Sequence, residues 1–295
     1  MSTDPQYTQS FIERGGDRIG IRVYAEPEGV VDAPVVVICP AMGVPAGYYR
    51  PFAAQLRAAG LAVVVWDLRG TGDSTPVPSR ASAYGFAEVL ADLDAVLAEI
   101  KPQLDGRKRI LLGHSLGGQM ATMHVALSGA DDIDGLALIA SSLPYWRAYP
   151  PPRRNALLPF SYAVSGTVKL LGVWPGWGFG GRQARGVIRD WAHTARTGRF
   201  PMIDGQDTEA AVRRIGLPVL AISVDNDSFT PHSAVDHLCA KFTSTTVQRE
   251  RYGPARLGRR VDHFNWTRAA GPLVERIAAF VADLRYLSVR FNEHT

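Results

Sequence analysis

Apolar and polar positions along the chain follow two alternating patterns. Short, nearly continuous runs of Val, Ile, Leu and Ala are typical of strands that are covered on both faces of a sheet. Four such runs stand in the first half of the chain: residues 34–39, 61–66, 109–112 and 136–139. Stretches with apolar residues at helical spacing, such as 48–59 and 86–104, lie between them. Because strands that alternate with helices are typical of βαβ units, the pattern predicts a parallel sheet.

Both ends of the chain add elements to this sheet. Two strands, residues 10–14 and 19–24, flank a Gly-Gly-Asp turn and predict a hairpin at the sheet edge. Residues 218–222 and 245–251 predict two more strands. A long helix begins near residue 271, with a proline at its first helical position.

The alternation is interrupted between residues 143 and 212. This stretch carries helical patterns at 160–171 and 182–196 and holds four of the six tryptophans. We therefore predict one sheet domain formed by residues 1–142 and 213–295, with residues 143–212 inserted as a mostly helical cap.

Composition and charge exclude several classes of protein. The chain has 46% hydrophobic and 20% charged residues, which excludes collagen, coiled coils and extensive disorder. Its net charge of +4 is diffuse and no basic run is long enough for a nucleic-acid patch, so we expect no nucleic-acid partner. The longest apolar stretches have about ten residues, too few to span a membrane.

The N-terminal sequence and the two cysteines indicate a cytoplasmic location. The N-terminus lacks the basic and apolar regions of a secretory signal peptide. The two cysteines, Cys39 and Cys239, stand far apart and are expected to be buried free thiols. Because free thiols persist in a reducing compartment, the sequence predicts a cytoplasmic protein.

The candidate for a catalytic nucleophile is Ser115, in the Gly-His-Ser-Leu-Gly sequence at residues 113–117. This G-x-S-x-G motif follows the strand at 109–112 and precedes the helical run at 118–127, the strand–turn–helix context that such a motif requires. The serine must occupy a sharp, strained turn so that its hydroxyl projects from the sheet. The positions two residues before and after it are glycine because the backbone packs too closely there for side chains.

Around this motif the chain resembles the α/β-hydrolase superfamily over nearly its whole length. It is most similar to a bacterial subgroup of capped hydrolases allied to serine esterases, at residues 41–45, 66–74 and 262–264. The resemblance implies the α/β-hydrolase fold, in which a mostly parallel eight-stranded sheet agrees with the strand pattern and carries, here, a helical cap insertion.

His263 is the candidate for the base that activates Ser115. A serine hydroxyl is a weak nucleophile unless a base takes its proton, and in this fold the order along the chain is Ser, acid, His. His263 stands after the last predicted strand and before the final helix, where the base belongs. The other histidines come too early, lie in the insertion or in the helix after the strand at 218–222, or lie in the C-terminal tail: His114, His124, His193, His232, His237 and His294.

Asp227 is the candidate for the acid that orients His263. It stands four residues before a proline in a loop after the strand at 218–222, as in the acid loop of the superfamily. Some relatives place the acid after the preceding strand, but residues 140–142 read Ala-Ser-Ser and carry no carboxylate. Asp225 stays as an alternative acid, with a turn-capping side chain as its other interpretation.

Acyl transfer through a serine also needs two N–H donors for the oxyanion of the intermediate. We expect the backbone N–H of Leu116 to be one of them. By similarity to the family motif the other is the N–H of Met42, although relatives often have His-Gly where residues 40–43 read Pro-Ala-Met-Gly. The residues predicted to bind substrate in a hydrophobic pocket are Met42, His114, Trp146, Trp174 and Trp177.

No cofactor or metal is expected. A G-x-G-x-x-G pattern at residues 176–181 lacks the strand that precedes a dinucleotide site, and no Cys/His cluster has zinc spacing. The predicted cap, residues 143–212, has a net charge of +5. This charge indicates either an anionic substrate at the mouth of the cap or a solvated surface.

Together these features predict a serine hydrolase that cleaves a carboxylic ester or thioester of a small-molecule substrate through an acyl-enzyme on Ser115. Three other hypotheses stay open. An acyltransferase with a non-water acceptor and a small-peptide or amide hydrolase would use the same triad, whereas a non-catalytic binding protein would keep only the fold. The sequence leaves the acyl group, the leaving group and the oligomeric state undetermined.

Overall fold

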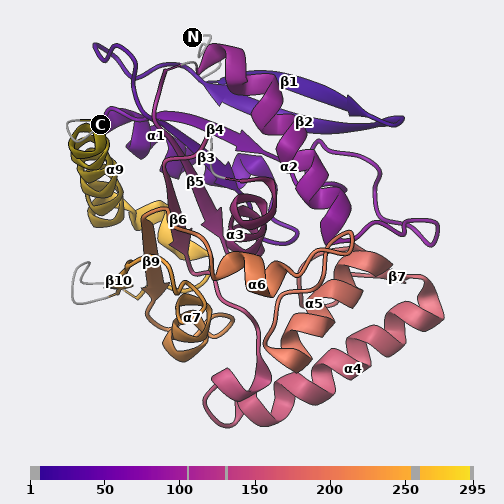
Figure 1. Cartoon of the computed structure of the whole chain (residues 1–295). Coiled ribbons are helices and arrows are strands. Elements are labelled where there is room, and N and C mark those ends of the chain that lie inside the picture. The colour runs from indigo at the N-terminus through magenta and orange to yellow at the C-terminus, as the bar shows by residue number, and fades with distance from the viewer. Residues whose placement is uncertain (1–6, 105, 130–131, 254–259, 293–295) are drawn as a thin grey trace.

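The computed structural model describes residues 7–104, 106–129, 132–253 and 260–292. Eight strands form one sheet in the order β1-β2-β4-β3-β5-β6-β9-β10 (Figure 1). β2 runs antiparallel to β1 and β4, while the pairs from β4 to β10 are parallel. The prediction of a mostly parallel eight-stranded sheet is thus confirmed. The strands are β1 (Tyr7–Arg14), β2 (Asp17–Tyr24), β3 (Val35–Cys39), β4 (Ala62–Trp66), β5 (Arg109–His114), β6 (Gly135–Ile139), β9 (Val219–Val224) and β10 (Val247–Tyr252).

The two faces of the central strand β3 point into two separate hydrophobic cores. All five residues of β3 are buried. Val35, Val37 and Cys39 belong to one core, whereas Val36 and Ile38 belong to the other. Because the side chains of a strand alternate between its faces, an unbroken apolar run is what a strand needs when helices cover both sides of it.

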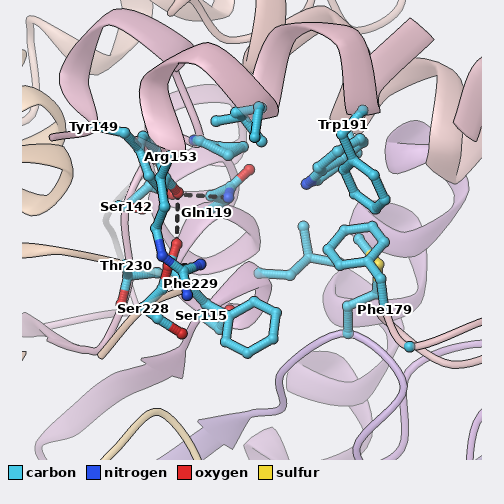
Figure 2. Close-up of a pocket in the computed structure, with 17 residues that line it drawn as sticks. Ser115, Gln119, Ser142, Tyr149, Arg153, Phe179, Trp191, Ser228, Phe229 and Thr230 are labelled. Carbon is cyan, nitrogen blue, oxygen red and sulfur yellow. Dashed lines mark hydrogen bonds between the residues drawn. The ribbon is translucent and has the colours of Figure 1, made fainter. Parts of the chain in front are cut away.

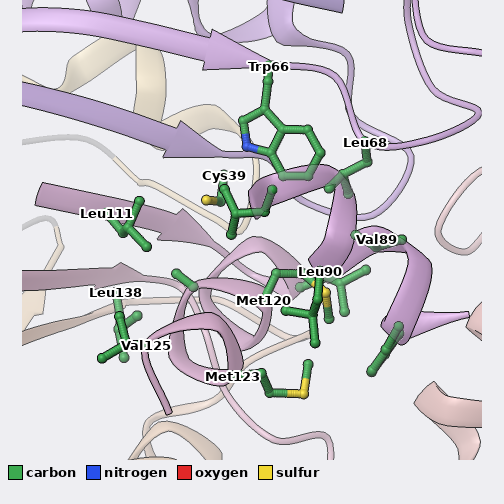
Figure 3. Packing of buried hydrophobic residues seen from close by; sticks show 14 of the residues in the cluster. Cys39, Trp66, Leu68, Val89, Leu90, Leu111, Met120, Met123, Val125 and Leu138 are labelled. Atoms are coloured by element: carbon green, nitrogen blue, oxygen red, sulfur yellow. The ribbon is translucent and has the colours of Figure 1, made fainter. Parts of the chain in front are cut away.

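Helices cover both faces of the sheet and contribute to both cores. They are α1 (Arg50–Ala58), α2 (Phe86–Ile100), α3 (Leu116–Ser128), α7 (His232–Cys239) and α9 (Gly271–Asn292), with short 3-10 turns η1 (Ala46–Tyr49), η2 (Lys101–Gln103) and η4 (Asn265–Ala269). Figure 3 shows Leu90 of α2 and Met120 of α3 in the core that contains Trp66. The opposite core takes Phe52 from α1 and Phe280 from α9. In the part of the chain that the structure describes, no helix combines the length and apolar character needed to cross a membrane.

Between β6 and β9 the chain leaves the sheet, and we call residues 140–218 the β6–β9 segment. Its elements are η3 (Trp146–Ala148), α4 (Arg153–Leu171), the paired β7 (Val173–Trp174) and β8 (Gln183–Ala184), α5 (Arg185–Thr197) and α6 (Thr208–Val212). α4 and α5 lie together at one end of the molecule (Figure 1). Arg196 of α5 joins them, because its guanidinium donates to the backbone oxygen of Ser161 at 2.7 Å and to the hydroxyl of Ser165 at 2.6 Å.

Helix α4 begins earlier than the sequence pattern predicts. The expected start at residue 160 follows a proline, which usually ends or kinks a helix. In the structure the helix starts at Arg153 and contains Pro159, so the expected start was wrong. Pro159 has no N–H to donate to the carbonyl of Asn155, four residues earlier in the helix. Both residues are exposed, so water can bind that carbonyl instead.

Candidate active site

Ser115 occupies a sharp turn between β5 and α3. Its backbone has φ 54° and ψ −119°, and a strained conformation of this kind costs a non-glycine residue about 1–3 kcal/mol. A Cβ atom at Gly117 would lie 1.9 Å from the carbonyl oxygen of Cys39, and one at Gly113 would lie 2.2 Å from the Cα of Gly118. Backbone contacts therefore require glycine on both sides of the serine.

Three side chains predicted from the sequence meet at this turn. Ser115 Oγ lies 3.0 Å from His263 Nε2, and His263 Nδ1 lies 2.7 Å from Asp227 Oδ2. The three residues follow β5, β10 and β9 in the chain, and these parallel strands end at the same edge of the sheet. The side chains of His263 and Asp227 are 5% and 0% exposed. The geometry is that of a Ser-His-Asp set, and the catalytic roles stay predictions.

Asp227 is held as a carboxylate by several donors. The backbone N–H groups of Phe229 and Thr230 each donate to its Oδ1 at 2.8 Å, and the Thr230 hydroxyl donates to Oδ2. Burial alone would raise the pKa of Asp227, but the hydrogen bond and charge of His263, together with the bonds from Thr230, outweigh it and lower the pKa. An ionised Asp227 accepts the Nδ1–H of His263 and leaves Nε2 to accept from the Ser115 hydroxyl.

The alternative acid, Asp225, contacts a different histidine. His232 Nε2 lies 3.0 Å from Asp225 Oδ1, and His232 Nδ1 lies 2.6 Å from Ser223 Oγ. This second Ser-His-Asp set cannot reach substrate, because Ser223 is fully buried in β9 and none of the three residues lines the cavity beside Ser115. The geometry therefore favours Asp227 as the partner of His263.

His114 connects the Met42 loop, residues 40–44 after β3, to His263 from inside the protein. Its Nε2 lies 2.9 Å from the carbonyl oxygen of His263, and a carbonyl can only accept, so Nε2 carries the proton. Nδ1 therefore accepts from the Tyr49 hydroxyl at 2.8 Å, and that hydroxyl accepts the N–H of Ala41 at 2.9 Å. This chain of hydrogen bonds fixes the backbone next to Met42 and the backbone of His263 at once.

The prediction that His114 binds substrate was wrong. The side chain is fully buried and does not line the cavity. Burial, reinforced by the nearby charge of His263, lowers the pKa of His114 well below its usual 6.5. His114 is thus a neutral residue behind the site and not a part of its surface.

A cavity of about 300 Å³ opens beside Ser115. Its two sides differ: Trp191 and Phe179 lie on one side of Ser115, and Tyr149, Arg153 and Ser228 on the other (Figure 2). The remaining lining residues are Met42, Leu116, Gln119, Ser142, Pro144, Ala156, Leu157, Phe160, Gly178, Phe229 and Thr230. Among the described residues no group of three or more His, Cys, Asp or Glu side chains could hold a metal ion.

The three tryptophans predicted to bind substrate lie elsewhere. Trp146, Trp174 and Trp177 do not line the cavity. Trp174 is buried and donates its Nε1–H to a backbone oxygen, while Trp177 is 65% exposed. Trp191 is the tryptophan of this segment that faces the cavity. In the sequence, Trp191 stands on the apolar face of the predicted helix 182–196. That face also packs on the core, so the pattern alone cannot distinguish a residue that lines the cavity from one that is buried in the core.

Met42 and Leu116 both line the cavity. The Met42 loop is a tight turn in which the Val44 N–H donates to the Ala41 carbonyl at 3.0 Å. Gly43 has φ 71°, the left-handed conformation that the third residue of a type II turn requires. The role of the two backbone N–H groups as oxyanion donors stays a prediction.

Comparison with known proteins identifies the family of this chain. Residues 32–256 match the family model described as serine aminopeptidase, S33. The chain belongs to this family, and with it to the α/β-hydrolase superfamily. The family membership confirms the resemblance to the α/β-hydrolase superfamily, and it identifies the protein as a hydrolase.

Solved structures with the same fold include several esterases and related enzymes. The thioesterase domain from the curacin biosynthetic pathway is 18% identical with a TM-score of 0.60, and the match covers 94% of this chain and 99% of that one. Est1E from Butyrivibrio proteoclasticus, with ferulic acid bound, is 17% identical with a TM-score of 0.60 and coverages of 95% and 99%. A hydrolase from Pseudomonas aeruginosa PA01 is 19% identical with a TM-score of 0.59 and coverages of 92% and 98%. At these identities the likeness shows the fold alone.

We expect one methyl group added at Gly117, beside the turn at Ser115, to destabilise the protein strongly. Gly117→Ala should lower the free energy of unfolding by at least about 2 kcal/mol, because the new Cβ would overlap backbone atoms that cannot rotate away. Gly166→Ala in α4 is the control, since nothing lies within 4 Å of its added Cβ, and it should raise stability by about 0.5–1 kcal/mol. Urea unfolding followed by tryptophan fluorescence measures both, and equal stability of the two variants would contradict this account of the turn.

His114 predicts a pH dependence of stability. The unfolded chain takes up a proton at His114 as the pH falls through 6.5, whereas the folded protein keeps it neutral. The stability that this residue contributes is therefore complete above pH 6.5 and is lost below it, by up to about 1.4 kcal/mol per pH unit. Unfolding free energies of wild type and His114→Asn at pH 7.5 and 5.5 test this. The difference between the two proteins should shrink at pH 5.5, and a constant difference would refute it.

Proposed function

We propose that this protein is a serine hydrolase that cleaves a carboxylic ester or thioester of a small molecule through an acyl-enzyme on Ser115. The observation that carries the proposal is the pair of hydrogen bonds, 3.0 Å from Ser115 to His263 and 2.7 Å from His263 to Asp227, at the wall of a cavity. A serine in this arrangement has the base and the orienting carboxylate that nucleophilic catalysis needs. The esterase and thioesterase among the similar structures are consistent with it.

In the acylation step, Ser115 Oγ attacks the substrate carbonyl carbon while His263 Nε2 takes the hydroxyl proton. Asp227 stabilises the imidazolium through Nδ1–H. The negative charge that develops on the carbonyl oxygen would be bound by the N–H groups of Met42 and Leu116, and losing one such donor typically costs about 3 kcal/mol of transition-state stabilisation. His263 then gives its proton to the departing alcohol or thiol, and the acyl group stays on Ser115.

Deacylation repeats these steps with water. His263 Nε2 takes a proton from a water molecule, which attacks the acyl carbon, and the tetrahedral intermediate collapses as Ser115 Oγ leaves and recovers its proton. The carboxylic acid is released and the site returns to its starting state. No cofactor enters this sequence.

The family description names an aminopeptidase, which makes peptide hydrolysis a second candidate function. An aminopeptidase must bind the protonated amine at the N-terminus of its substrate, and a carboxylate is the natural partner for it. None of the described residues that line the cavity is Asp or Glu, and the charged one is Arg153. The lining therefore favours an ester or thioester over a peptide with a free N-terminus.

We further propose that residues 143–212 act as the cap of the site in a cytoplasmic enzyme. Tyr149, Leu157, Phe179 and Trp191 belong to this stretch and line the cavity. A covered site also suits an acyltransferase, in which an alcohol or amine replaces water. Product analysis with a competing alcohol acceptor separates the two reactions, because hydrolysis yields only the free acid.

The proposal predicts a strict dependence on Ser115. Wild-type protein should react with a fluorophosphonate probe at Ser115, located by mass spectrometry, and should hydrolyse short p-nitrophenyl esters. Ser115→Ala should lose the label and at least about a thousandfold in kcat. Absence of both labelling and ester turnover in folded wild-type protein would favour the non-catalytic binding protein.

The two neighbouring aspartates provide a matched pair of variants. Asp227→Asn should lower kcat by about 10³–10⁴-fold, because a neutral amide neither fixes the His263 tautomer nor stabilises the imidazolium. Asp225→Asn should keep kcat within about threefold of wild type, since Asp225 contacts His232 and not His263. The opposite ranking in steady-state kinetics would assign the acid to Asp225.

A further inference from the structure

The two sides of the cavity differ in chemistry as well as in position. Phe160, Phe179 and Trp191 form a contiguous aromatic group, with ring centroids 5.5 Å apart for Phe160 and Phe179 and 4.6 Å apart for Phe179 and Trp191. On the other side of Ser115, Arg153 reaches down from the first turn of α4 (Figure 2). One bound molecule can therefore contact an apolar surface and a cation at the same time.

The charge of Arg153 is not neutralised by a neighbouring carboxylate. Its Nη1 donates to the backbone oxygen of Ser228 at 2.7 Å, and this acceptor is uncharged. No Asp or Glu oxygen of the described chain lies within salt-bridge distance of its guanidinium, whereas Arg189 of α5 pairs with Asp190 at 2.8 Å. A guanidinium has five N–H donors in a planar fork that matches a carboxylate, so Arg153 retains donors for an anion in the cavity.

The position of Arg153 assigns it to one half of the substrate. His263 must deliver a proton to the leaving group, so the leaving group lies on the His263 side of Ser115. Ser228 and Phe229 directly follow Asp227, and the Phe229 ring lies 5.1 Å from the His263 ring. Arg153, bonded to Ser228, is therefore on the leaving-group side, and the aromatic group is left for the acyl part.

We propose that Arg153 binds a carboxylate on the leaving alcohol or thiol, so that the substrate combines an apolar acyl group with an anionic leaving group. This inference rests on the proposed hydrolysis through Ser115 and names the class of ester that the site selects. Arg153 would then be the positive charge of the β6–β9 segment that contacts the substrate, because it is the charged residue among the described residues that line the cavity.

Arg153 also joins α4 to the loop after Asp227, and the test must separate that structural role from anion binding. The Tyr149 hydroxyl donates to the Phe229 carbonyl at 2.5 Å, and Ser233 Oγ donates to the Ala148 carbonyl at 2.6 Å. These bonds tie the start of the β6–β9 segment to the same region independently of Arg153. Replacement of Arg153 should therefore leave the loop in place.

The kinetic test compares two esters that differ in one charge. Both carry a butanoyl group, and the leaving group is 3-hydroxybenzoate in one and 3-hydroxybenzamide in the other. Wild type should prefer the anionic ester by about tenfold or more in kcat/KM, mainly through KM. Arg153→Gln should reduce that preference to about one, mainly through a higher KM for the anionic ester. Arg153→Lys should keep part of the preference, because it retains the charge without the planar fork.

Two controls sharpen the comparison. Arg147→Gln removes a guanidinium that stacks over Trp146, 4.8 Å from the ring centroid, outside the cavity, and it should keep the full preference. A second ester pair, phenyl hydrogen glutarate and phenyl pentanoate, moves the charge to the acyl group and should show no Arg153-dependent preference for the anion. Equal kcat/KM for the two butanoate esters in wild type, or an unchanged preference in Arg153→Gln, would overturn the inference. An Arg153-dependent preference in the acyl pair alone would overturn the assignment to the leaving group.

A binding measurement distinguishes failure of this inference from failure of the proposed hydrolysis. Calorimetry with Ser115→Ala should show tighter binding of 3-hydroxybenzoate than of 3-hydroxybenzamide, and loss of that difference in Ser115→Ala/Arg153→Gln. Arg153-dependent anion binding without any ester turnover would refute the hydrolysis and retain the anion site. Ester turnover by wild type without selective binding of the anion would refute the anion site and retain the hydrolysis.

Discussion

The contact between the backbone at Gly117 and the Cys39 carbonyl is the constraint on which the candidate site depends. It brings the first turn of α3 against the end of β3, so the chain after β5 must turn sharply and Ser115 must adopt φ 54°. A hydroxyl held in this way needs no rearrangement before it meets a substrate. The strain of the turn is offset by the surrounding strands, which are buried on both faces and cannot relax separately.

A chain of buried hydrogen bonds behind the site holds the backbone of the site in place. The chain from the Ala41 N–H through Tyr49 and His114 to the His263 carbonyl joins the segment after β3, the end of β5 and the loop after β10. In this chain the Tyr49 hydroxyl and the His114 ring each donate one hydrogen bond and accept one. A buried polar network rigidifies a protein when its groups are paired in this way, and it destabilises the protein when they are not. The neutral state of His114 keeps a second positive charge away from His263.

The β6–β9 segment decides what the site can bind. The turns and loops that follow β5, β9 and β10 supply Ser115, Asp227 and His263, but the aromatic group and Arg153 come from α4, α5 and the chain between them. A conserved type of fold can thus carry one set of reacting groups and acquire its selectivity from a separate segment. In this chain the segment sets an apolar surface and an unneutralised cation on opposite sides of the nucleophile.

Local pattern was sufficient for the frame of the molecule. Apolar runs predicted the central strands of the sheet, because a strand buried on both faces admits few polar residues, and a Gly-Gly-Asp turn predicted the hairpin at its edge. The G-x-S-x-G motif, the order of acid and histidine, and the carboxylate-free residues 140–142 singled out Ser115, Asp227 and His263 as candidates, since each stands in a turn or loop that follows a predictable strand. What the sequence itself determined is therefore the sheet, the turn at Ser115 and the candidates at the ends of its strands.

Tertiary packing alone decided which way the other side chains point. Trp191 faces the cavity while Trp146, Trp174 and Trp177 do not, and His114 lies behind the site although it is next to Ser115 in the chain. Periodicity separates the apolar from the polar face of a helix, but it cannot distinguish an apolar face that packs on the core from one that borders a cavity. That distinction, and the absence of a carboxylate beside Arg153 in the described chain, depends on contacts between residues distant in sequence, which exist only once α4 and α5 have packed over the ends of the strands.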